Sequence, residues 1–276
     1  MRIAVVQMEP AWKDEVANLA QVDRWLGELA DQDVGLAVFP ECALSGYELS
    51  AAEAAHFAHP IPGPQSEALV DLARRHRRTF QIGLLELAPS GEIYNSCILV
   101  SPHGMLGSYR KTHLPFLGVD RYLQPGGRIG PVLDTGLARI GPLICYDLRF
   151  PEPARVLALL GAQVVLLSTA WPDSATLYPE FLAPTRAAEN GVFLAAANRI
   201  GREGGTKYLG RSLIIDPAGA ILAEGSEDQA ELLIADVDLS ASDEKRRIFV
   251  PGEYELDLLG DRRPELYHTL TERNVP

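Results

Sequence analysis

Short apolar runs and amphipathic stretches alternate along the first half of the chain. Residues 2–8 and 36–39 are short apolar runs rich in Val, Ile and Phe, a pattern typical of strands covered on both faces. Between them, apolar residues recur at steps of three and four from Val16 to Leu29, which predicts an amphipathic helix. A second helix, at about residues 65–77, is followed by strand-like runs at residues 80–87, 94–100 and 105–109.

The second half of the chain repeats this order of elements. Residues 138–145 and 164–168 are predicted strands, separated by a helix at residues 153–160. A helix at residues 178–190 follows, and Gly191 stands where a helix C-cap favours glycine. The remaining strand-like runs are residues 192–198, 213–215, 221–223 and 232–237. Each half is therefore predicted to run β-α-β-α-β-β-β, an approximate structural repeat without obvious sequence identity.

Two sheets packed face to face, with helices on both outer faces, satisfy this order of elements. The predicted fold class is α/β, an α-β-β-α sandwich of two mixed sheets. A single doubly wound sheet is the alternative, but the additional hairpins fit it poorly. A chain of 276 residues lies near the size limit of one hydrophobic core, so residues 1–276 are expected to form one domain. Residues 246–276 mix Pro and Gly with scattered apolar residues, and we expect an extended tail lying on a surface.

The composition narrows the classes of function. The formal net charge of −12 weighs against binding to nucleic acid or to acidic membranes, because both need a basic face. The sequence has no run of about 18 apolar residues, so no membrane span is predicted. It enters a strand pattern at residue 2 without a basic leader or cleavage site. Its three cysteines are too few, and odd in number, for a disulfide framework. We therefore expect a cytoplasmic protein.

Three residues with reactive or charged side chains each stand at the end of a predicted strand. Cys145 closes an apolar run just before a predicted helix, where open α/β sheets place ligands, and its thiolate would be a strong nucleophile. Glu41 leaves a buried strand and is a candidate general base. Lys111 ends another strand and is a candidate for stabilising negative charge on sulfur or on an oxyanion. Each residue alone also fits a structural role, as a buried cysteine, a capping carboxylate and a solvated lysine.

Two other kinds of chemistry are less well supported. His113 is a candidate partner for a cysteine nucleophile, but it lies two residues from Lys111, and one strand cannot easily direct both side chains into one site. The six histidines are scattered and include no His-Glu-x-x-His motif, so no metal site is predicted. His56 and His59 are expected on an exposed helix face. The glycine-bearing stretches match neither phosphate-binding fingerprint.

Three separated segments resemble motifs of the nitrilase, or carbon–nitrogen hydrolase, superfamily. These segments are Phe39-Pro40-Glu41 with Gly46-Tyr47, Tyr109-Arg110-Lys111-Thr112-His113-Leu114-Pro115, and Cys145-Tyr146-Asp147-Leu148-Arg149-Phe150-Pro151-Glu152. Residues 186–190 and Asn198 resemble the stretch that follows the nucleophile in this superfamily. The match covers residues 1 to about 250, and three motifs in the expected order make it specific.

This resemblance implies a four-layer α-β-β-α fold and a catalytic triad of Glu41, Lys111 and Cys145. The triad would work through an acyl-thioester intermediate and without a cofactor. The resemblance also implies that Lys111 and the backbone N–H of Tyr146 hold the oxyanion.

The stretch after the lysine departs from the family pattern. Many relatives carry a second glutamate before the following Pro-Gly, whereas residues 116–126 contain no glutamate and only one acid, Asp120. Asp120 is therefore the candidate for a second carboxylate. The substrate pocket is expected in the predicted loops at residues 43–50, 117–123 and 171–178, where specificity usually resides, with Tyr47 and Trp171 as candidates.

The residues after the cysteine bear on the reaction. Tyr146-Asp147 resembles amidase members such as ω-amidases, whereas true nitrilases tend to carry Trp-Glu there. The expected function is a thiol hydrolase that cleaves a non-peptide C–N bond of a small amide and releases ammonia. An N-carbamoyl amidohydrolase is the alternative, and a nitrilase is less favoured. A catalytically silent scaffold of the same fold is the alternative outside enzymes.

The tail points to self-association. Residues 246–267 carry too many apolar side chains for a free tail, yet no regular period with which to build a core. The family resemblance points the same way, because relatives commonly form dimers, some through the helices flanking the nucleophile and the C-terminal tail. We expect a homodimer at least, with the tail along or across the interface. A tail packed on its own subunit is the alternative.

Overall fold

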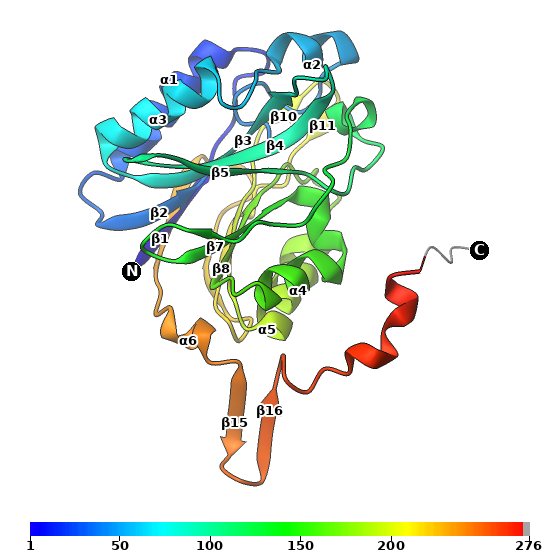
Figure 1. The fold of residues 1–276 in the computed structure, drawn as a ribbon. Helices are drawn as coiled ribbons and strands as arrows, with labels where there is room; N and C mark the ends of the chain where they lie inside the picture. The colour runs from blue at the N-terminus through cyan, green and yellow to red at the C-terminus, as the bar shows by residue number, and fades with distance from the viewer. Residues whose placement is uncertain (273–276) are drawn as a thin grey trace.

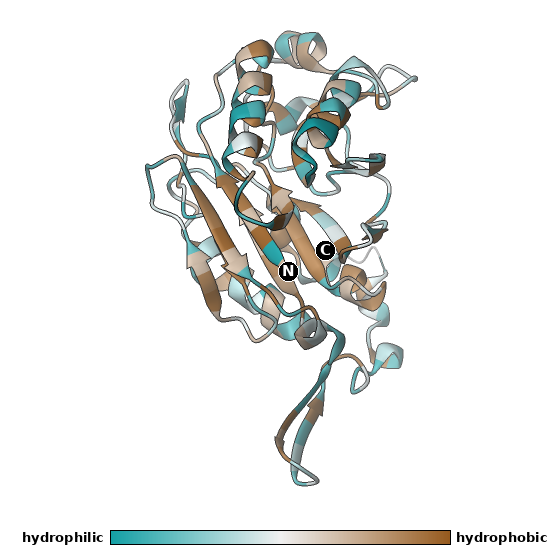
Figure 2. Ribbon diagram, turned by 90° about the vertical axis from the view of Figure 1, so that its left-hand side faces the viewer, coloured by the Kyte–Doolittle hydropathy of each residue, from teal (hydrophilic) through white to brown (hydrophobic). Residues whose placement is uncertain are grey.

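Two six-stranded sheets lie face to face in the computed structural model, which describes residues 1–272, and helices cover both outer faces (Figure 1). The strands of the body are mostly hydrophobic, whereas the helices that cover them also carry hydrophilic residues (Figure 2). The predicted four-layer α-β-β-α sandwich of two mixed sheets is therefore confirmed.

The first sheet has the strand order β14-β1-β2-β3-β4-β5. Its strands are β14 (Glu231–Asp236), β1 (Arg2–Gln7), β2 (Val34–Val38), β3 (Thr79–Leu87), β4 (Ile93–Ser101) and β5 (Gly104–Arg110). β1, β2 and β3 are parallel, whereas β4, β5 and β14 pair antiparallel with their neighbours. Strand β14 comes from the second half of the chain and pairs with β1, with Arg2 opposite Asp236. The two halves therefore share a sheet, which the repeat in the sequence did not predict.

The second sheet has the strand order β13-β12-β9-β8-β7-β6. Its strands are β13 (Ile221–Glu224), β12 (Leu213–Ile215), β9 (Phe193–Ala197), β8 (Val164–Ser168), β7 (Arg139–Ile144) and β6 (Leu133–Asp134). β7, β8 and β9 are parallel, and the outer strands are antiparallel. A small separate hairpin joins β10 (Arg202–Glu203) to β11 (Thr206–Lys207).

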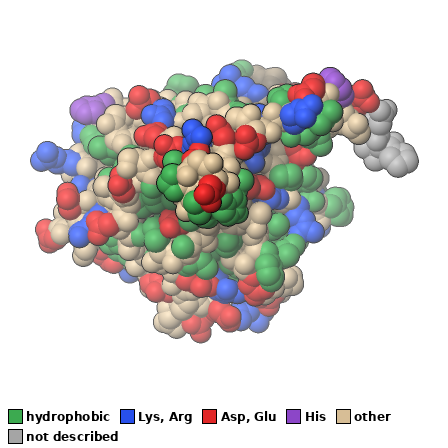
Figure 3. All heavy atoms as spheres, turned by 90° about the horizontal axis from the view of Figure 1, so that it is seen from below, with side chains coloured by type: hydrophobic (Ala, Val, Ile, Leu, Met, Phe, Trp, Pro, Cys, Tyr) green, Lys and Arg blue, Asp and Glu red, His purple; other side chains and the backbone are tan. Residues whose placement is uncertain are grey.

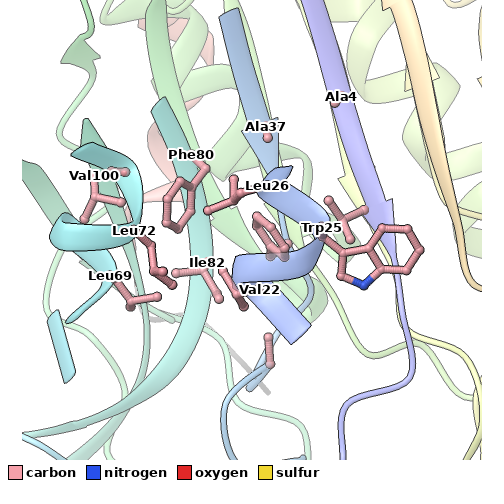
Figure 4. Packing of buried hydrophobic residues seen from close by; sticks show 14 of the residues in the cluster. Ala4, Val22, Trp25, Leu26, Ala37, Leu69, Leu72, Phe80, Ile82 and Val100 are labelled. Atoms are coloured by element: carbon pink, nitrogen blue, oxygen red, sulfur yellow. The ribbon is translucent and has the colours of Figure 1, made fainter. Parts of the chain in front are cut away.

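Alternate residues of the central strands face two different cores. On β1, Ile3 and Val5 pack between the two sheets, whereas Ala4 and Val6 pack against helices on the outer face. That outer core is shown in Figure 4, where Trp25 and other side chains of the helices meet the strands. The helices of this face are α1 (Glu15–Glu28) and α3 (Pro64–His76), and those on the second sheet are α4 (Pro151–Leu159) and α5 (Ala183–Asn190).

The helix predicted at residues 178–190 has two parts. Tyr178–Leu182 is a π-helical turn, in which the N–H of Ala183 donates to the Tyr178 carbonyl, and α5 follows it. Pro184 has no N–H for the regular bond to residue 180, which favours the wider turn. Gly191 ends α5 in the left-handed conformation, with φ of 57°, so the predicted glycine cap is confirmed.

The sequence analysis did not predict α2 (Ala51–Phe57). This helix begins with a capping box, in which Ser50 and Glu53 exchange hydrogen bonds, and that signal is visible in the sequence. His56 lies exposed on α2, as expected. The expectation for His59 was wrong, because it lies beyond the helix and its Nε2 pairs with Oε2 of Glu15 at 3.0 Å.

After α6 (Ser240–Asp243), the C-terminal segment leaves the body (Figure 1). Strands β15 (Arg246–Val250) and β16 (Tyr254–Asp257) form a hairpin that projects from the sandwich, rather than a tail lying on its surface. Two short 3₁₀ turns follow, Pro264–Leu266 and His268–Leu270. Apolar side chains are exposed along this segment: Ile248, Phe249, Val250, Tyr254, Leu256, Leu266, Tyr267 and Leu270. Seen from below, many apolar atoms gather at the protruding hairpin (Figure 3).

Long polar side chains of the body and of the hairpin fix the base of this segment. Lys245 Nζ donates to the carbonyl of Gly191 at 2.6 Å, and Arg155 donates to the carbonyl of Leu258 at 3.1 Å. The base of the hairpin is therefore fixed to the body, while its tip remains exposed. Among residues 1–272, no helix has both the length and the apolar character that crossing a bilayer requires.

Candidate active site

The three residues predicted as a triad lie at one edge of the sandwich. Glu41 follows β2, Lys111 follows β5 and Cys145 follows β7. β5 runs in the same direction as β2, because two antiparallel pairings separate it from β3. The Glu41 N–H donates across the sheets to the carbonyl of Thr169 at 3.4 Å, which brings the two edges together. Glu41 and Lys111 are fully buried and Cys145 is 7% exposed.

Lys111 lies between two carboxylates. Its Nζ is 2.6 Å from Oε1 of Glu41 and 2.5 Å from Oδ2 of Asp120. Asp120 comes from a 3₁₀ turn, Gly118–Tyr122, and is buried. The structure thus brings the candidate second carboxylate directly to the lysine. With all three groups ionised, this buried cluster carries one net negative charge, so it needs further hydrogen-bond donors.

Asn95 supplies two of those donors. Its Nδ2 donates to Oε1 of Glu41 at 2.7 Å and to Oδ1 of Asp120 at 2.8 Å, which uses both of its amide hydrogens. Its backbone carbonyl accepts from the Lys111 N–H at 2.8 Å. Asn95 therefore holds all three charged groups from the neighbouring strand, β4. Oε2 of Glu41 has no hydrogen-bond partner among residues 1–272, which leaves one buried oxygen available to accept a proton.

Tyr47, a pocket candidate, lies against the second carboxylate. Its hydroxyl donates to Oδ2 of Asp120 at 2.8 Å, and its ring centroid is 5.7 Å from Lys111 Nζ. Gly118 packs so closely on the Tyr47 ring that a Cβ there would lie 2.3 Å from a ring carbon. The backbone N–H of Tyr47 donates to the buried carboxylate of Glu203 at 2.8 Å. Tyr47 is therefore held from both ends and contributes to the site through Asp120.

The charges around Cys145 oppose one another. Burial raises the pKa of its thiol, Glu41 raises it further, and the Lys111 ammonium lowers it. The net effect is a raised pKa, so the resting sulfur is a thiol and a base must take its proton. Burial also raises the pKa of Glu41, against the opposing effect of Lys111. For Lys111, burial lowers the pKa, but Asp120 and Glu41 raise it by more, so the lysine stays protonated.

Cys145 stands in a strained turn. Its φ is +43°, in the left-handed region that residues other than glycine rarely adopt, at a cost of about 1–3 kcal/mol. It begins a 3₁₀ turn, Cys145–Arg149, directly after β7. The N–H of Tyr146 lies in the first part of this turn, where backbone N–H groups have no acceptor within the helix. The turn thus presents the sulfur and a backbone donor at the same strand end.

Asp147 ties this turn to the segment that carries the lysine. Its carboxylate accepts from Tyr109 OH at 2.9 Å, Thr112 Oγ1 at 2.9 Å and the His113 N–H at 3.0 Å. It also accepts from the Ile144 N–H at 3.2 Å, just before the cysteine. The imidazole Nδ1 of His113 lies 2.8 Å from the same carboxylate. The His113 side chain therefore supports the turn through Asp147, and Asp147 fixes the position of the lysine segment relative to the nucleophile.

Trp171 lies beyond β8 and belongs to the same buried cluster as Cys145. Its ring stacks on Tyr178 with centroids 5.2 Å apart, and the backbone N–H of Trp171 donates to Oδ1 of Asn198 at 2.8 Å. Burial is the main reason that the pKa of Tyr178 is raised, and the negative charge of a Cys145 thiolate raises it further. The two stacked rings therefore form an aromatic wall near the nucleophile, and Tyr178 joins Trp171 as a pocket candidate.

Sequence reasoning missed the roles of Asn95 and Asp147 in this arrangement. Asn95 is a polar residue in a largely apolar strand, which was a visible signal, but its partners are remote in sequence. Asp147 was part of the cysteine segment without an assigned contact. Among residues 1–272, no group of three His, Cys, Asp or Glu side chains is placed to hold a metal ion.

Comparison with known proteins is consistent with this geometry. A family model described as carbon–nitrogen hydrolase matches residues 2–247. The chain belongs to the carbon–nitrogen hydrolase family. It is therefore a hydrolase, and the resemblance drawn from the three sequence segments is confirmed.

Individual members of the carbon–nitrogen hydrolase family are similar over almost the whole chain. A protein named nitrilase from Pyrococcus abyssi is 35% identical, with 97% of this chain and 99% of that protein covered. An (R)-stereoselective amidase of a Pseudomonas species is 35% identical, with 99% and 95% covered. An omega-amidase of Escherichia coli is 32% identical, with 90% and 94% covered.

Solved structures of the family include an amidase from Nesterenkonia sp. AN1, of the nitrilase superfamily. It superposes with a TM-score of 0.81 at 30% identity, covering 98% of this chain and 97% of that one. Another structure of that amidase shows the product of acrylamide addition at its active-site cysteine. The likeness confirms the nitrilase-type fold of this carbon–nitrogen hydrolase.

Proposed function

We propose that this hydrolase is an amidase that cleaves a small linear amide through an acyl-enzyme on Cys145 and releases ammonia. The observation that carries the proposal is the buried position of Lys111 between Glu41 and Asp120, at the strand ends where Cys145 emerges. A surface role for the lysine, or a plain capping role for the glutamate, does not account for this arrangement. The charges of Lys111 and Glu41 are both buried, and several hydrogen bonds hold them in place.

The proposed reaction begins with proton transfer. As the sulfur of Cys145 attacks the amide carbon, its proton passes to the free Oε2 of Glu41. The carbonyl oxygen becomes an oxyanion, which Lys111 and the Tyr146 N–H stabilise. Glu41 then gives its proton to the departing nitrogen, the C–N bond breaks, and ammonia leaves a thioester on Cys145. In the second half, Glu41 takes a proton from water, whose oxygen attacks the thioester and releases the acid and the thiol.

Asp120 has a positioning role in this proposal. It balances the ammonium of Lys111, so that the lysine can sit in a buried site without giving up its proton to Glu41. Tyr47 orients Asp120 through its hydroxyl, and Trp171 contributes to the wall of the pocket. Asp120 is shorter than the second glutamate expected from the family pattern, and Gly118 allows its turn to approach Tyr47 closely.

The names of relatives support amides as the substrate class. The relatives include the (R)-stereoselective amidase, the omega-amidase and a 2-oxoglutaramate amidase of Bacillus subtilis. The nitrilase name of the Pyrococcus abyssi relative keeps nitrile hydrolysis as a competing candidate. Hydrolysis of N-carbamoyl compounds is the other alternative, because the same acyl-enzyme chemistry would serve it.

We further propose a homodimer in the cytoplasm. The exposed apolar side chains of the projecting hairpin support a subunit interface there. All three cysteines are free thiols, which fits a reducing compartment.

A substrate panel tests the proposed reaction. Ammonia release is measured over small aliphatic amides, ω-amides of dicarboxylic acids, N-carbamoyl compounds and nitriles, with and without exhaustive chelation of metals. We expect the highest kcat/KM for an amide, and no loss on chelation. Hydroxylamine added during turnover should yield a hydroxamate from the acyl-enzyme. Faster turnover of a carbamoyl compound or nitrile than of every amide would overturn the assignment. If there is neither turnover nor a trapped acyl group, the result would favour a catalytically silent scaffold.

A further inference from the structure

A buried hydroxyl lies beside the nucleophile and has no assigned role. β7 and β8 are parallel neighbours, and Ile144 is paired with Ser168 at their carboxyl ends. The next residues along these strands, Cys145 and Thr169, therefore leave the sheet side by side. Thr169 is fully buried, and its Oγ1 has no hydrogen-bond partner of its own among residues 1–272.

The backbone of Thr169 is fixed on both sides. Its N–H donates to the carbonyl of Ala197 at 2.9 Å, and its carbonyl accepts from the N–H of Glu41 at 3.4 Å. The residue thus sits between the base and the nucleophile, held by main-chain bonds that leave the hydroxyl uncommitted. A hydroxyl buried without a partner destabilises a fold, since water has been lost and nothing replaces it. Such a group is explained if its partner forms during the reaction.

We propose that the Thr169 hydroxyl is a further catalytic group, which donates a hydrogen bond to Sγ of Cys145 as the sulfur becomes a thiolate. This inference rests on the proposed nucleophilic role of Cys145. The thiol proton still passes to Oε2 of Glu41, and the hydroxyl proton stays on Thr169 throughout, so no additional proton is transferred. The hydrogen bond from Thr169 strengthens as negative charge grows on sulfur. A bond that forms mainly in this charged state accelerates the attack of sulfur on the amide.

The electrostatics of the site show why such a donor matters. Burial and Glu41 both raise the pKa of Cys145, whereas Lys111 lowers it. The Thr169 hydroxyl makes no hydrogen bond with residues 1–272 in the resting site, but it lies close enough to a charged sulfur to lower the pKa of Cys145, as does the Ala170 N–H. The positive charge of Lys111 is already shared between Glu41 and Asp120. Neutral hydrogen-bond donors near sulfur therefore stabilise the thiolate further, because the charge of Lys111 is shared with two carboxylates.

Paired substitutions separate a hydrogen bond from mere packing. Thr169→Val keeps the shape of the side chain and removes the hydroxyl, whereas Thr169→Ser keeps the hydroxyl and removes a methyl group. The readout is the rate of alkylation of Cys145 by iodoacetamide as a function of pH, with the modified peptide identified by mass spectrometry. This measurement needs no knowledge of the substrate, and Cys145→Ala serves as the control for labelling at Cys42 or Cys97.

We expect Thr169→Val to be alkylated at least tenfold more slowly at neutral pH, with its apparent pKa moved upward. Thr169→Ser should remain within about threefold of the unmodified enzyme and keep its pH profile. Should Thr169→Val fail to fold, as judged by thermal unfolding, Thr169→Ala takes its place in the comparison with Thr169→Ser.

Alkylation of the valine or alanine variant at the unmodified rate and profile would overturn the role of Thr169 and leave Cys145 as the nucleophile. A Cys145 that is not alkylated in the unmodified enzyme, together with turnover by Cys145→Ala, would instead overturn the proposed function.

Discussion

The site and the C-terminal hairpin reverse the usual distribution of polar and apolar groups in opposite ways. At the strand ends, Glu41, Lys111 and Asp120 are charged and buried. Along β15 and β16, apolar side chains such as Phe249 and Ile248 are exposed. A chain of this size buries roughly three quarters of the surface that its unfolded form exposes, so it needs neither arrangement for stability. Each region therefore calls for an explanation outside the folding of one subunit.

The two regions differ in how complete they are. Every charge at the site has a partner within the chain, from Asn95 and Tyr47 to the lysine itself. Among the described residues 1–272, the hairpin has no such complement: the ring of Phe249 stacks on Tyr254 of the same hairpin, and both remain exposed. The site is thus preorganised within one subunit, whereas the hairpin presents a surface that another molecule would complete. Substitutions in the two regions should accordingly affect different measurements.

Cys145→Ala should have the largest effect on activity. Removing the sulfur removes the atom that forms the proposed acyl-enzyme, so turnover should fall to the background rate. Alanine keeps the Cβ and carries the same strain as cysteine at a φ of +43°, so the fold and the melting temperature should stay near those of the unmodified enzyme. Ammonia release and thermal unfolding, measured on the same preparation, check both statements.

Cys42→Ala and Cys97→Ala are the matched controls, because both cysteines are also buried thiols. Each should retain most of the activity. Turnover by Cys145→Ala at a tenth of the unmodified rate or more would show that the nucleophile is another residue.

Lys111→Met should be the next most damaging change. Methionine keeps much of the length of the stem and removes the charge, so the oxyanion loses one stabiliser, which typically costs about 10²–10³ in kcat. We expect at least that loss, because the ammonium also favours the thiolate. Arg110→Met, at the partly exposed neighbouring position that pairs with Glu86, is the control and should retain most of its activity. Near-normal kcat in Lys111→Met would place the lysine outside the chemistry.

Asp120→Asn should have an intermediate effect. The amide keeps the shape but leaves Lys111 with one carboxylate, and hydrogen bonds between charged groups are worth about 1.5–3 kcal/mol, so kcat/KM should fall roughly 10- to 100-fold. Asp120→Glu restores the charge and should recover part of the loss. Steady-state kinetics on the best amide of the panel measure both variants. Equal activity of Asp120→Asn and the unmodified enzyme would remove the second carboxylate from the mechanism.

Much of the fold could be predicted from the sequence, but little of the hydrogen-bond network around Glu41, Lys111 and Cys145 could. Strand β12 was predicted at Leu213–Ile215 as observed, and Gly191 marked the end of α5, because these signals are local. The pairing of β14 with β1 depends on contacts more than 200 residues apart in the chain, which periodicity does not encode. The same limit applies to Asn95, whose two carboxylate partners lie on other segments.

The convergence of Glu41, Lys111 and Cys145 was predictable for a different reason. Glu41, Lys111 and Cys145 each followed a recognisable strand, and family motifs surrounded them, so their convergence at one edge needed no contact information. Asp147 shows the converse case. It was visible within a motif, but its role of joining Ile144 to His113 emerged only from the folded geometry.

Removing the hairpin should affect activity least and assembly most. A chain ending at Lys245 lacks the exposed apolar strands but keeps the site, whose described partners all lie between Glu41 and Glu203. Light scattering should give a mass near twice the 30.1 kDa of one chain for the intact protein and near one chain for the truncated form. Phe249→Ser should weaken association, whereas Val16→Ser, at an exposed apolar position on α1, should not. A monodisperse intact monomer would rule out the dimer. A truncated form that stays dimeric would show that other surfaces join the subunits, and the exposed side chains of the hairpin would then need a different partner.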